Sequence, residues 1–300
     1  MINGIINVYK EAGFTSHDVV AKLRGILRQK KIGHTGTLDP DATGVLPVCL
    51  GKGTKLADML TNTDKTYEAV LELGLTTDTQ DISGTVIKRS EVNVKEDEVS
   101  ACIQAFVGEC MQIPPMYSAL KVDGKKLYEL AREGKEIERQ PRKVVFREIE
   151  ILDMSLPRVT LKVTCSKGTY IRTLCHDIGE TLGPGGCMKS LIRTRVGVFE
   201  IEDSRTLCEI EAIMKNGKLS ELVRTVDSMF LQYPAIATKP EYDSRIYNGN
   251  TFDATQVEGE FDGKTESFRV YDSKGSFVGI YQYQAPQQIF KLVRMFFEKG

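Results

Sequence analysis

The sequence predicts an α/β fold with a second, small β-rich unit toward its C-terminal end. Residues 67–73 and 159–165 alternate between apolar and polar side chains, which is the period-two pattern of half-buried strands. Apolar side chains recur at helical spacing over residues 19–27 and 171–182. After residue 231, short apolar runs are separated by turn residues, which indicates closely spaced strands.

The other expected elements are marked by local start and stop signals. Residues 5–8 form a short strand, and a turn then leads to Ser16, the expected N-cap of the first helix. This helix should end at Gly33, and its basic C-terminal end suits the helix dipole. A further helix is expected over residues 96–107, with Gly108 as its stop.

Composition bounds the class of protein. The 300 residues, 41% of them hydrophobic, suffice for one large and one small domain. The N-terminal residues lack the pattern of a signal peptide, and no apolar run approaches the ~18 residues of a spanning helix, so we expect a cytoplasmic protein without a membrane partner.

The cysteine pattern argues against disulfides and zinc. The seven cysteines are odd in number, scattered and without a CxxC pair. They are Cys49, Cys102, Cys110, Cys165, Cys175, Cys187 and Cys208. We therefore expect reduced, mostly buried thiols and no metal site.

Positive charge is concentrated in three segments, although the net charge is only −1. Residues 1–60 carry eight Lys or Arg against five acids, residues 117–147 carry nine against five, and residues 160–196 carry six against two. A nucleic-acid partner requires such local positive potential rather than a basic chain. Solvated basic faces of a protein with another function remain an alternative.

A turn-rich segment, GHTGTLDPDATGVLP at 33–47, is the most distinctive feature of the chain. Its glycines, prolines and threonines predict a rigid loop rather than a regular element, with Asp39 directly before Pro40. A carboxylate on a stiff loop is a candidate nucleophile, base or metal ligand. The alternative is that Asp39 and Asp41 only stabilise turns.

This loop resembles the signature loop of the TruB family of tRNA pseudouridine synthases, at residues 33–40 and again at 42–47. The resemblance implies that Asp39 is the catalytic aspartate and that His34 touches the RNA beside the target uridine. It also implies a mixed, largely antiparallel sheet of the pseudouridine synthase fold. The expected catalytic domain is 1–227, and a PUA-like RNA-binding domain should follow at 228–300.

Three further segments resemble family motifs. In DKTYEA, Tyr67 corresponds to the tyrosine that stacks on the reacting base and could help remove the final proton. In SKGTYIRT, Arg172 corresponds to the arginine that pairs with the catalytic aspartate, and Tyr170 helps line the base pocket. Lys167 precedes a helix N-terminus, where anions are favoured. In SLIRTRVG, Leu191 falls where a leucine packs against the flipped nucleotide.

Two features concern RNA contacts. Ile192 stands where many family members have a basic residue, which puts one backbone contact in doubt. Residues 117–145, with a short helix expected at 125–132, form a basic, turn-bounded insertion that resembles the family's mobile thumb loop.

The resemblance implies isomerisation of the uridine at position 55 in the TΨC loop of tRNA, by a monomer with no obligate protein partner. The reaction detaches uracil, rotates it and rejoins it through carbon, so no metal, redox partner or other cofactor is needed. Asp39 could attack the sugar or the base, and Arg172 should keep Asp39 ionised by lowering its pKa. Extrusion of the uridine costs a few kcal/mol, and His34 could fill the vacated space.

Other functions fit less well. GKGTK at 51–55 lacks the spacing of a phosphate-binding NTPase loop. A glycosidase using Asp39 and Asp41 would need two carboxylates that face one substrate, which residues two apart on a tight loop do not ensure. A non-catalytic RNA-binding or tRNA-folding module of the same architecture remains open.

Overall fold

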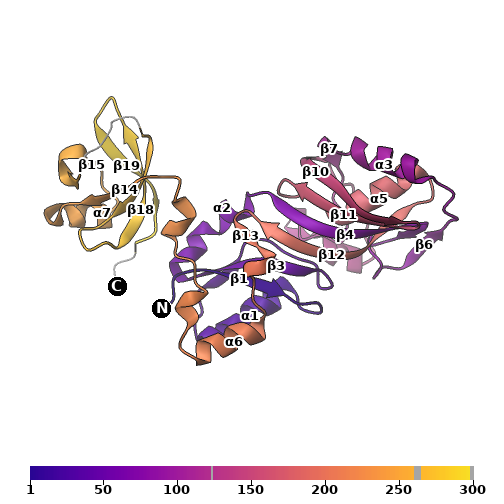
Figure 1. Cartoon of the computed structure of the whole chain (residues 1–300), viewed down its shortest axis with the longest axis horizontal. Coiled ribbons are helices and arrows are strands. Elements are labelled where there is room, and N and C mark those ends of the chain that lie inside the picture. Colours follow the sequence, from indigo (N-terminus) through magenta and orange to yellow (C-terminus); the bar gives the residue numbers. More distant parts are fainter. Residues whose placement is uncertain (123, 260–264, 298–300) are drawn as a thin grey trace.

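The computed structural model describes residues 1–122, 124–259 and 265–297 and contains two β-rich bodies (Figure 1). The larger one has a nine-stranded sheet and the smaller one a six-stranded sheet. No helix in the described part of the chain is long and apolar enough to cross a membrane.

The large sheet has the strand order β1-β3-β12-β4-β11-β10-β7, with β2 paired to β3 and β13 to β12. Its pairings are antiparallel except for the parallel contact between β12 and β3. The mixed, largely antiparallel sheet predicted from the sequence is therefore confirmed. Its strands are β1 Gly4–Lys10, β2 Ile32–His34, β3 Thr43–Leu50, β4 Lys65–Leu73, β7 Gly108–Gln112, β10 Arg142–Ser155, β11 Arg158–Cys165, β12 Gly186–Val196 and β13 Phe199–Glu200.

Helices cover the sheet on its apolar faces, which are both faces of β1 and β3 but only one face of β4 and β11. The two faces of β1 and β3 belong to different clusters. Ile6 and Val48 pack with helices, whereas Ile5 and Cys49 pack with short helical segments and with strand residues such as Phe199 and Ile280. The larger helices are α1 Ser16–Leu27, α3 Glu96–Ala105, α5 Ile171–Leu182 and α6 Leu207–Lys215. Helices α1 and α6 cover β1 and β3, whereas α3 and α5 cover β4, β10 and β11.

The remaining elements of the large body are short. The hairpin β5–β6 follows β4, and the basic insertion contains the hairpin β8–β9 and α4. Their bounds are η1 Gly51–Leu56, α2 Ala57–Thr61, β5 Leu75–Thr77, β6 Val86–Arg89, β8 Lys121–Val122, β9 Lys125–Lys126, α4 Leu127–Arg132, η2 Ile201–Asp203, η3 Leu219–Glu221 and η4 Asp227–Phe230.

The C-terminal body is β-rich, as the sequence predicts, with the strand order β15-β19-β18-β17-β14-β16. Its Ile280 and Phe296 share a buried cluster with Leu56 of the large body, and Arg294 Nη1 donates to the Lys55 carbonyl at 2.7 Å. Its elements are β14 Ala235–Thr238, η5 Pro240–Tyr242, α7 Asp243–Tyr247, β15 Phe252–Asp253, η6 Ala254–Gln256, β16 Val257–Glu258, β17 Ser267–Tyr271, β18 Phe277–Gln284 and β19 Ile289–Met295.

The first helix differs from the sequence prediction at both ends. Its N-cap is Thr15, whose hydroxyl accepts from Asp18 N in a capping box, so the prediction of Ser16 was wrong. It ends at Leu27, with Arg28 in the left-handed conformation, rather than at Gly33. The chain can therefore form β2 before the loop.

The Asp39 loop is shorter than predicted. Gly33 and His34 pair with Cys49 and Val48, and residues 43–47 belong to β3. Only residues 35–42 lie outside regular strands. The expectation that the whole segment is irregular was therefore wrong. The glycines and the proline at its two ends are accommodated in β2 and β3, whose other side chains are mostly buried.

Candidate active site

Three polar contacts fix the backbone of the Asp39 loop. Lys10, buried at the end of β1, donates from Nζ to the carbonyls of Pro40 at 2.9 Å and Ala42 at 2.5 Å. The Leu38 amide donates to Ser16 Oγ at 2.9 Å. Side chains of β1 and α1 therefore hold the segments on both sides of Asp39, and Ser16 serves the loop instead of capping the helix.

Arg172 reaches Asp39 from the first turn of α5. Its Nε lies 3.0 Å from Asp39 Oδ2, and its Nη1 lies 3.3 Å from Asp81 Oδ2. Arg172 Nη2 also donates to the Tyr117 carbonyl at 2.8 Å. The Arg172 side chain is only 6% exposed, so it is fixed between two carboxylates and the backbone at the start of the basic insertion.

The electrostatic environment of Asp39 differs from the prediction. Burial raises the pKa of Asp39, while Arg172 lowers it by a smaller amount and Asp81 raises it further. Arg172 therefore acts on the Asp39 pKa in the expected downward direction, but burial has the larger effect and the net direction is upward. The Asp39 side chain still has 40% of its surface exposed.

Tyr67 and Leu191 lie on neighbouring strands, in the same apolar cluster as Leu38 and Ala42 of the loop. Tyr67 is near the start of β4, and Leu191 on β12 pairs with Ala69 two residues further along β4. Burial raises the pKa of the Tyr67 phenol to about 12. The sheet therefore brings an aromatic ring and a leucine beside the loop that carries Asp39.

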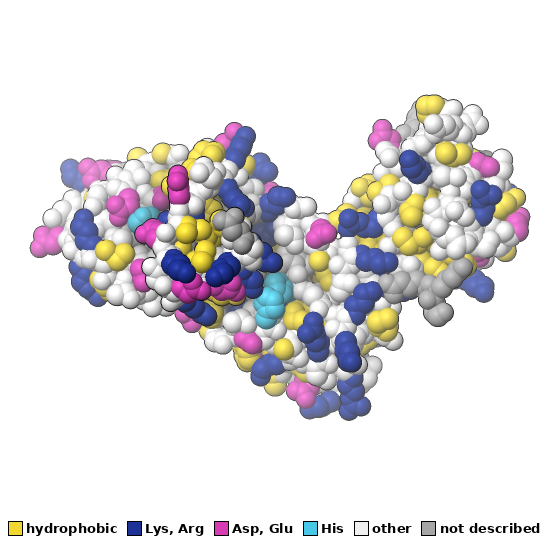
Figure 2. Space-filling model, turned by 180° about the vertical axis from the view of Figure 1, so that it is seen from behind, with side chains coloured by type: hydrophobic (Ala, Val, Ile, Leu, Met, Phe, Trp, Pro, Cys, Tyr) yellow, Lys and Arg dark blue, Asp and Glu magenta, His cyan; other side chains and the backbone are white. Residues whose placement is uncertain are grey.

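His34 closes β2 and faces a second histidine. Its ring centroid is 5.2 Å from that of His17 at an edge-on angle of 83°, and its Nδ1 accepts from the Gly36 amide at 3.3 Å. Burial lowers the pKa of His34. Figure 2 shows a patch of histidine side chains in the middle of the face that lies between groups of Lys and Arg.

Tyr170 and Lys167 occupy different surroundings. Tyr170 is the N-cap residue of α5, and its amide donates to Gln112 Oε1 at 2.8 Å. Burial raises the pKa of its phenol. Lys167 Nζ donates to Asn62 Oδ1 at 2.6 Å, beside the end of α2. The structure thus directs the Lys167 amine toward α2 rather than toward the Asp39 carboxylate.

Sequence reasoning missed three residues of this site. Lys10 and Arg193 are cations buried in strands, and Asp81 follows the β5 strand in TDTQD. Lys10 is 0% exposed, and a fully buried lysine requires a specific acceptor. The carbonyls of the Asp39 loop supply it. The pairing of Asp81 with Arg172 spans 91 positions and has no local signal.

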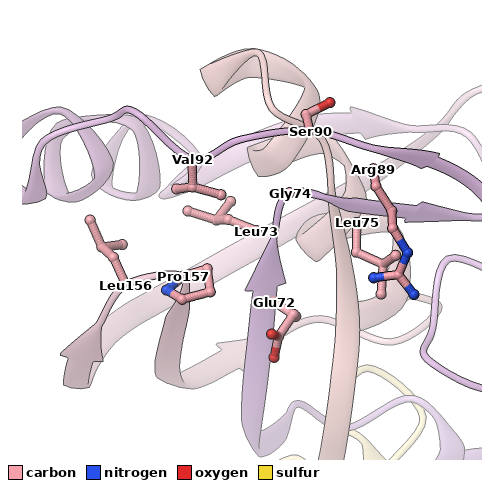
Figure 3. Close-up of a pocket in the computed structure, with 9 residues that line it drawn as sticks. All are labelled: Glu72, Leu73, Gly74, Leu75, Arg89, Ser90, Val92, Leu156 and Pro157. Carbon is pink, nitrogen blue, oxygen red and sulfur yellow. The ribbon is translucent and has the colours of Figure 1, made fainter.

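Other features of the structure do not add to the site. Within the described ranges, no three His, Cys, Asp or Glu side chains come together as a metal centre requires. A groove of about 420 Å³ lies at the other end of β4, near Glu72, Gly74 and Arg89 (Figure 3). Glu72 lies five positions after Tyr67, or roughly 17 Å along a strand, so this groove is distinct from the Asp39 site.

Comparison with protein families identifies the chain. The model of the TruB family pseudouridylate synthase N-terminal domain matches residues 24–171, and that of the tRNA pseudouridylate synthase B C-terminal domain matches residues 172–231. The chain belongs to the TruB family. It is therefore an isomerase that forms pseudouridine, and the glycosidase and NTPase alternatives are set aside.

Curated relatives of this TruB family member match along almost the whole chain. A tRNA pseudouridine synthase B of Lachnoclostridium phytofermentans is 52% identical and covers 98% of this chain and 100% of its own length. One of Clostridium kluyveri is 44% identical, with the same coverage. The matching family models end at residue 231, so the PUA-like assignment of the C-terminal body stays a prediction.

Solved structures share the fold. One is a structure of an H/ACA RNP bound to a substrate RNA containing 2'-deoxyuridine. Its matching chain has a TM-score of 0.71 and 25% sequence identity, and the match covers 98% of the present chain and 85% of the matching chain. A Cbf5-Nop10-Gar1 complex gives a TM-score of 0.70 and 26% identity with the same coverage. The predicted pseudouridine synthase fold is thereby confirmed.

Proposed function

We propose that this TruB family member converts the uridine at position 55 in the T arm of tRNA to pseudouridine, with Asp39 as the nucleophile. The observation that carries the proposal is the contact of 3.0 Å between Asp39 and Arg172, on a loop whose Leu38 and Ala42 pack in the same cluster as Tyr67. Relatives at 52% and 44% identity bear the name tRNA pseudouridine synthase B, which supports tRNA as the substrate.

The proposed mechanism begins with an extruded uridine. Tyr67 stacks on its base, Leu191 packs against the nucleotide, and Tyr170 lines the pocket. His34 fills the space that the nucleotide leaves, and its uncharged form suits this role because burial lowers its pKa. Lys167 contacts the RNA backbone after release from Asn62. The carboxylate of Asp39 then attacks the nucleotide, and the loop contacts from Lys10 and Ser16 keep it in place.

Arg172 has a positioning and electrostatic role in this proposal. It opposes the rise in the Asp39 pKa that burial causes, and so increases the fraction of Asp39 side chains that are ionised. Asp81 orients the opposite side of the guanidinium. The bond to the Tyr117 carbonyl couples this network to the insertion at 117–145, which we propose acts as a thumb that closes over bound RNA.

The proposed organisation has a catalytic domain at 1–227 and an RNA-binding domain at 228–300. We propose that a monomer acts alone, in the cytoplasm where tRNA matures. Size-exclusion chromatography with light scattering at micromolar concentration should give a mass near 33.5 kDa. A stable dimer would contradict the monomer.

The test of the proposed substrate is tritium release from tRNA transcripts that carry uridine labelled at carbon 5. The chain should release about one equivalent of tritium from an ordinary transcript and none when uridine 55 is replaced by cytidine. Release that persists in the cytidine transcript would contradict the choice of position. Binding of both transcripts without any release would favour the non-catalytic RNA-binding alternative.

A further inference from the structure

The first turn of α5 is bonded from outside the helix by one short segment of the chain. Gln112 is the last residue of β7, and its Nε2 donates to the Tyr170 carbonyl at 3.0 Å, while its Oε1 accepts from the Tyr170 amide at 2.8 Å. Further along, the Tyr117 carbonyl accepts from Arg172 Nη2 at 2.8 Å. Residues 112–117, which we call the anchor segment, therefore bond both the N-cap residue of α5 and the arginine of the candidate site.

The Gln112 side chain forms a matched pair of bonds with the backbone of a single residue. A backbone amide only donates and a backbone carbonyl only accepts, so Tyr170 determines how the Gln112 amide is oriented. Gln112 is 4% exposed, so water hardly competes for either bond. The Tyr170 carbonyl also accepts from the Leu174 amide at 3.1 Å, which is the first backbone bond of α5. Gln112 thus holds the residue from which the helix is built.

The start of α5 is not fixed by a cap of its own. The N-cap residue Tyr170 makes no side-chain bond to the first turn. Helices α1 and α6 differ, because Thr15 and Thr206 close their N-termini with capping boxes. The position of the first turn of α5 therefore depends on contacts from outside the helix, and Gln112 supplies two of them.

The Arg172 guanidinium has little freedom to compensate for a displaced helix start. Arg172 is the second residue of α5, and its side chain is only 6% exposed. It contacts Asp39 at 3.0 Å, and it donates to the carbonyls of Thr79 at 3.1 Å and Tyr117 at 2.8 Å. The guanidinium is a rigid, planar set of donors, so these contacts require one backbone position. A misplacement of about 1 Å can slow catalysis by about 100-fold.

The anchor segment is itself stiff and largely buried. Pro114 and Pro115 occupy its middle, where their rings fix φ and restrict the residue before each of them. Pro114, Pro115 and Met116 are buried, whereas the described residues of 119–141 are mostly exposed. The anchor segment is therefore packed as part of the large body, and the exposed part of the basic insertion begins after it.

We propose that Gln112 is a positioning residue for pseudouridine formation, because its paired bonds with Tyr170 set the start of α5 where Arg172 can contact Asp39. Gln112 touches no reacting atom in this proposal. Its role rests on the proposed function, since it acts only through the contact between Arg172 and Asp39. The alternative is that Gln112 only stabilises the fold, and the two roles differ in the effect of its loss once Arg172 has been replaced.

The test is a double-mutant cycle on the full chain, with tritium release measured in single turnover at saturating tRNA. Gln112→Met keeps a side chain of similar size but removes both bonds with Tyr170. It should slow the reaction by about tenfold or more and leave the tRNA dissociation constant within about threefold, because a displaced Arg172 affects the chemical step. An unaltered rate, or a loss confined to the dissociation constant, would overturn the proposal.

The second step of the cycle combines Gln112→Met with Arg172→Lys. Arg172→Lys alone should slow the reaction by about 100-fold. The double variant should stay within about threefold of Arg172→Lys, because the contact that Gln112 positions is already lost. If Gln112→Met instead slows the Arg172→Lys variant as much as it slows the unaltered chain, Gln112 does not act through Arg172 and is only a structural residue.

Gln104→Met is the matched control. Gln104 on α3 also donates from its side-chain amide to a backbone carbonyl, that of Ile149 at 3.1 Å, but it does not bond the first turn of α5. Its replacement should leave the saturated rate unchanged, both alone and together with Arg172→Lys. A loss equal to that of Gln112→Met would refute a specific role of Gln112.

A further variant removes one of the two bonds without changing any side chain. Replacement of Tyr170 by its α-hydroxy acid, introduced by nonsense suppression, turns the backbone amide into an ester and deletes the donor to Gln112 Oε1. The saturated rate should fall, and adding Gln112→Met should cost little more. Circular dichroism verifies folding, and the ester variant carries the test should Gln112→Met not fold. A folded ester variant with the full rate would contradict the proposal.

The same measurements separate this inference from the proposed function. An unaltered chain that releases no tritium, or an Arg172→Lys variant with the full rate, would overturn the proposed function and the role of Gln112 with it. A slow Arg172→Lys variant whose loss multiplies with that of Gln112→Met would overturn the role of Gln112 alone.

Discussion

At the scale of single residues, the site depends on how one carboxylate is balanced between burial and positive charge. Asp39 is desolvated, which favours its protonated form, and Arg172 opposes this from 3.0 Å. Arg172 also bonds Asp81 and the carbonyls of Thr79 and Tyr117, so its guanidinium uses its full set of donors in one fixed geometry.

Replacement of this guanidinium should impair catalysis more than binding. Arg172→Lys keeps a positive charge but cannot contact Asp39, Asp81 and the Tyr117 carbonyl together. We expect the single-turnover rate to fall about 100-fold at saturating tRNA, with the dissociation constant within about fivefold. Arg158→Lys, at an exposed ion pair with Glu72, should behave like the unaltered chain. Equal rates for both variants would contradict this role of Arg172.

The acid limb of activity should report the raised pKa of Asp39. In the proposed mechanism Asp39 acts as the carboxylate, so kcat/KM should fall as pH drops through its folded-state pKa. Since burial raises this pKa above the ordinary value of 3.8, the inflection should lie above 3.8. The measurement is kcat/KM between pH 4 and 8, with circular dichroism to verify folding. A value of kcat/KM that stays constant down to pH 4, while the chain remains folded, would contradict the account.

At the scale of elements, the loop depends on close contact between β3 and β12. Gly44 has a φ of +103°, and a Cβ there would lie 2.2 Å from the Arg193 carbonyl oxygen. Both the backbone conformation and the contact exclude a side chain. Gly44 thus allows the strand after Asp39 to pass directly beside the strand that carries Arg193 and Leu191.

Gly44→Ala should therefore destabilise the protein by about 2–4 kcal/mol, measured by urea unfolding. Gly25→Ala is the control, because Gly25 lies within α1, with no φ in the left-handed region and no atom within 4 Å of an added Cβ. That change should be neutral or stabilising by about 0.5–1 kcal/mol. Equal free energies of unfolding for the Gly44→Ala and Gly25→Ala proteins would contradict the importance of the close contact between β3 and β12.

The sequence predicted these elements where the signal is local and missed the contacts between them. Alternation over 67–73 located β4 and the inward face of Tyr67, and helical spacing located α5 with Arg172 in its first turn. The ends of the Asp39 loop were misplaced because its glycines and prolines also fit the strands beside it. Asp81 and Arg193 could not be assigned, because their partners are fixed only by the assembled sheet.

At the scale of the whole molecule, a chain with almost no net charge presents basic groups around one face. Figure 2 shows Lys and Arg on both sides of the histidine patch. The C-terminal body packs against η1 of the large body through Phe296 and Arg294. The basic groups on this face form the surface proposed to bind tRNA.

Binding through this surface should weaken steeply with salt. Each phosphate contact releases counterions, so raising KCl from 50 to 200 mM should increase the tRNA dissociation constant at least tenfold. The single-turnover rate at saturating tRNA should change less than twofold, because the buried Arg172 is poorly screened. Filter binding at several salt concentrations measures the slope. A flat response would contradict the role of the basic segments.

The most direct test of the central claim replaces one carboxyl oxygen in the loop. Asp39→Asn should abolish tritium release from labelled tRNA in single turnover, while tRNA still binds, because the amide is not a nucleophile. Asp41→Asn, two residues away on the exposed side of the same loop, should retain a rate within about threefold of the unaltered chain. Turnover by Asp39→Asn at the rate of Asp41→Asn would contradict the account.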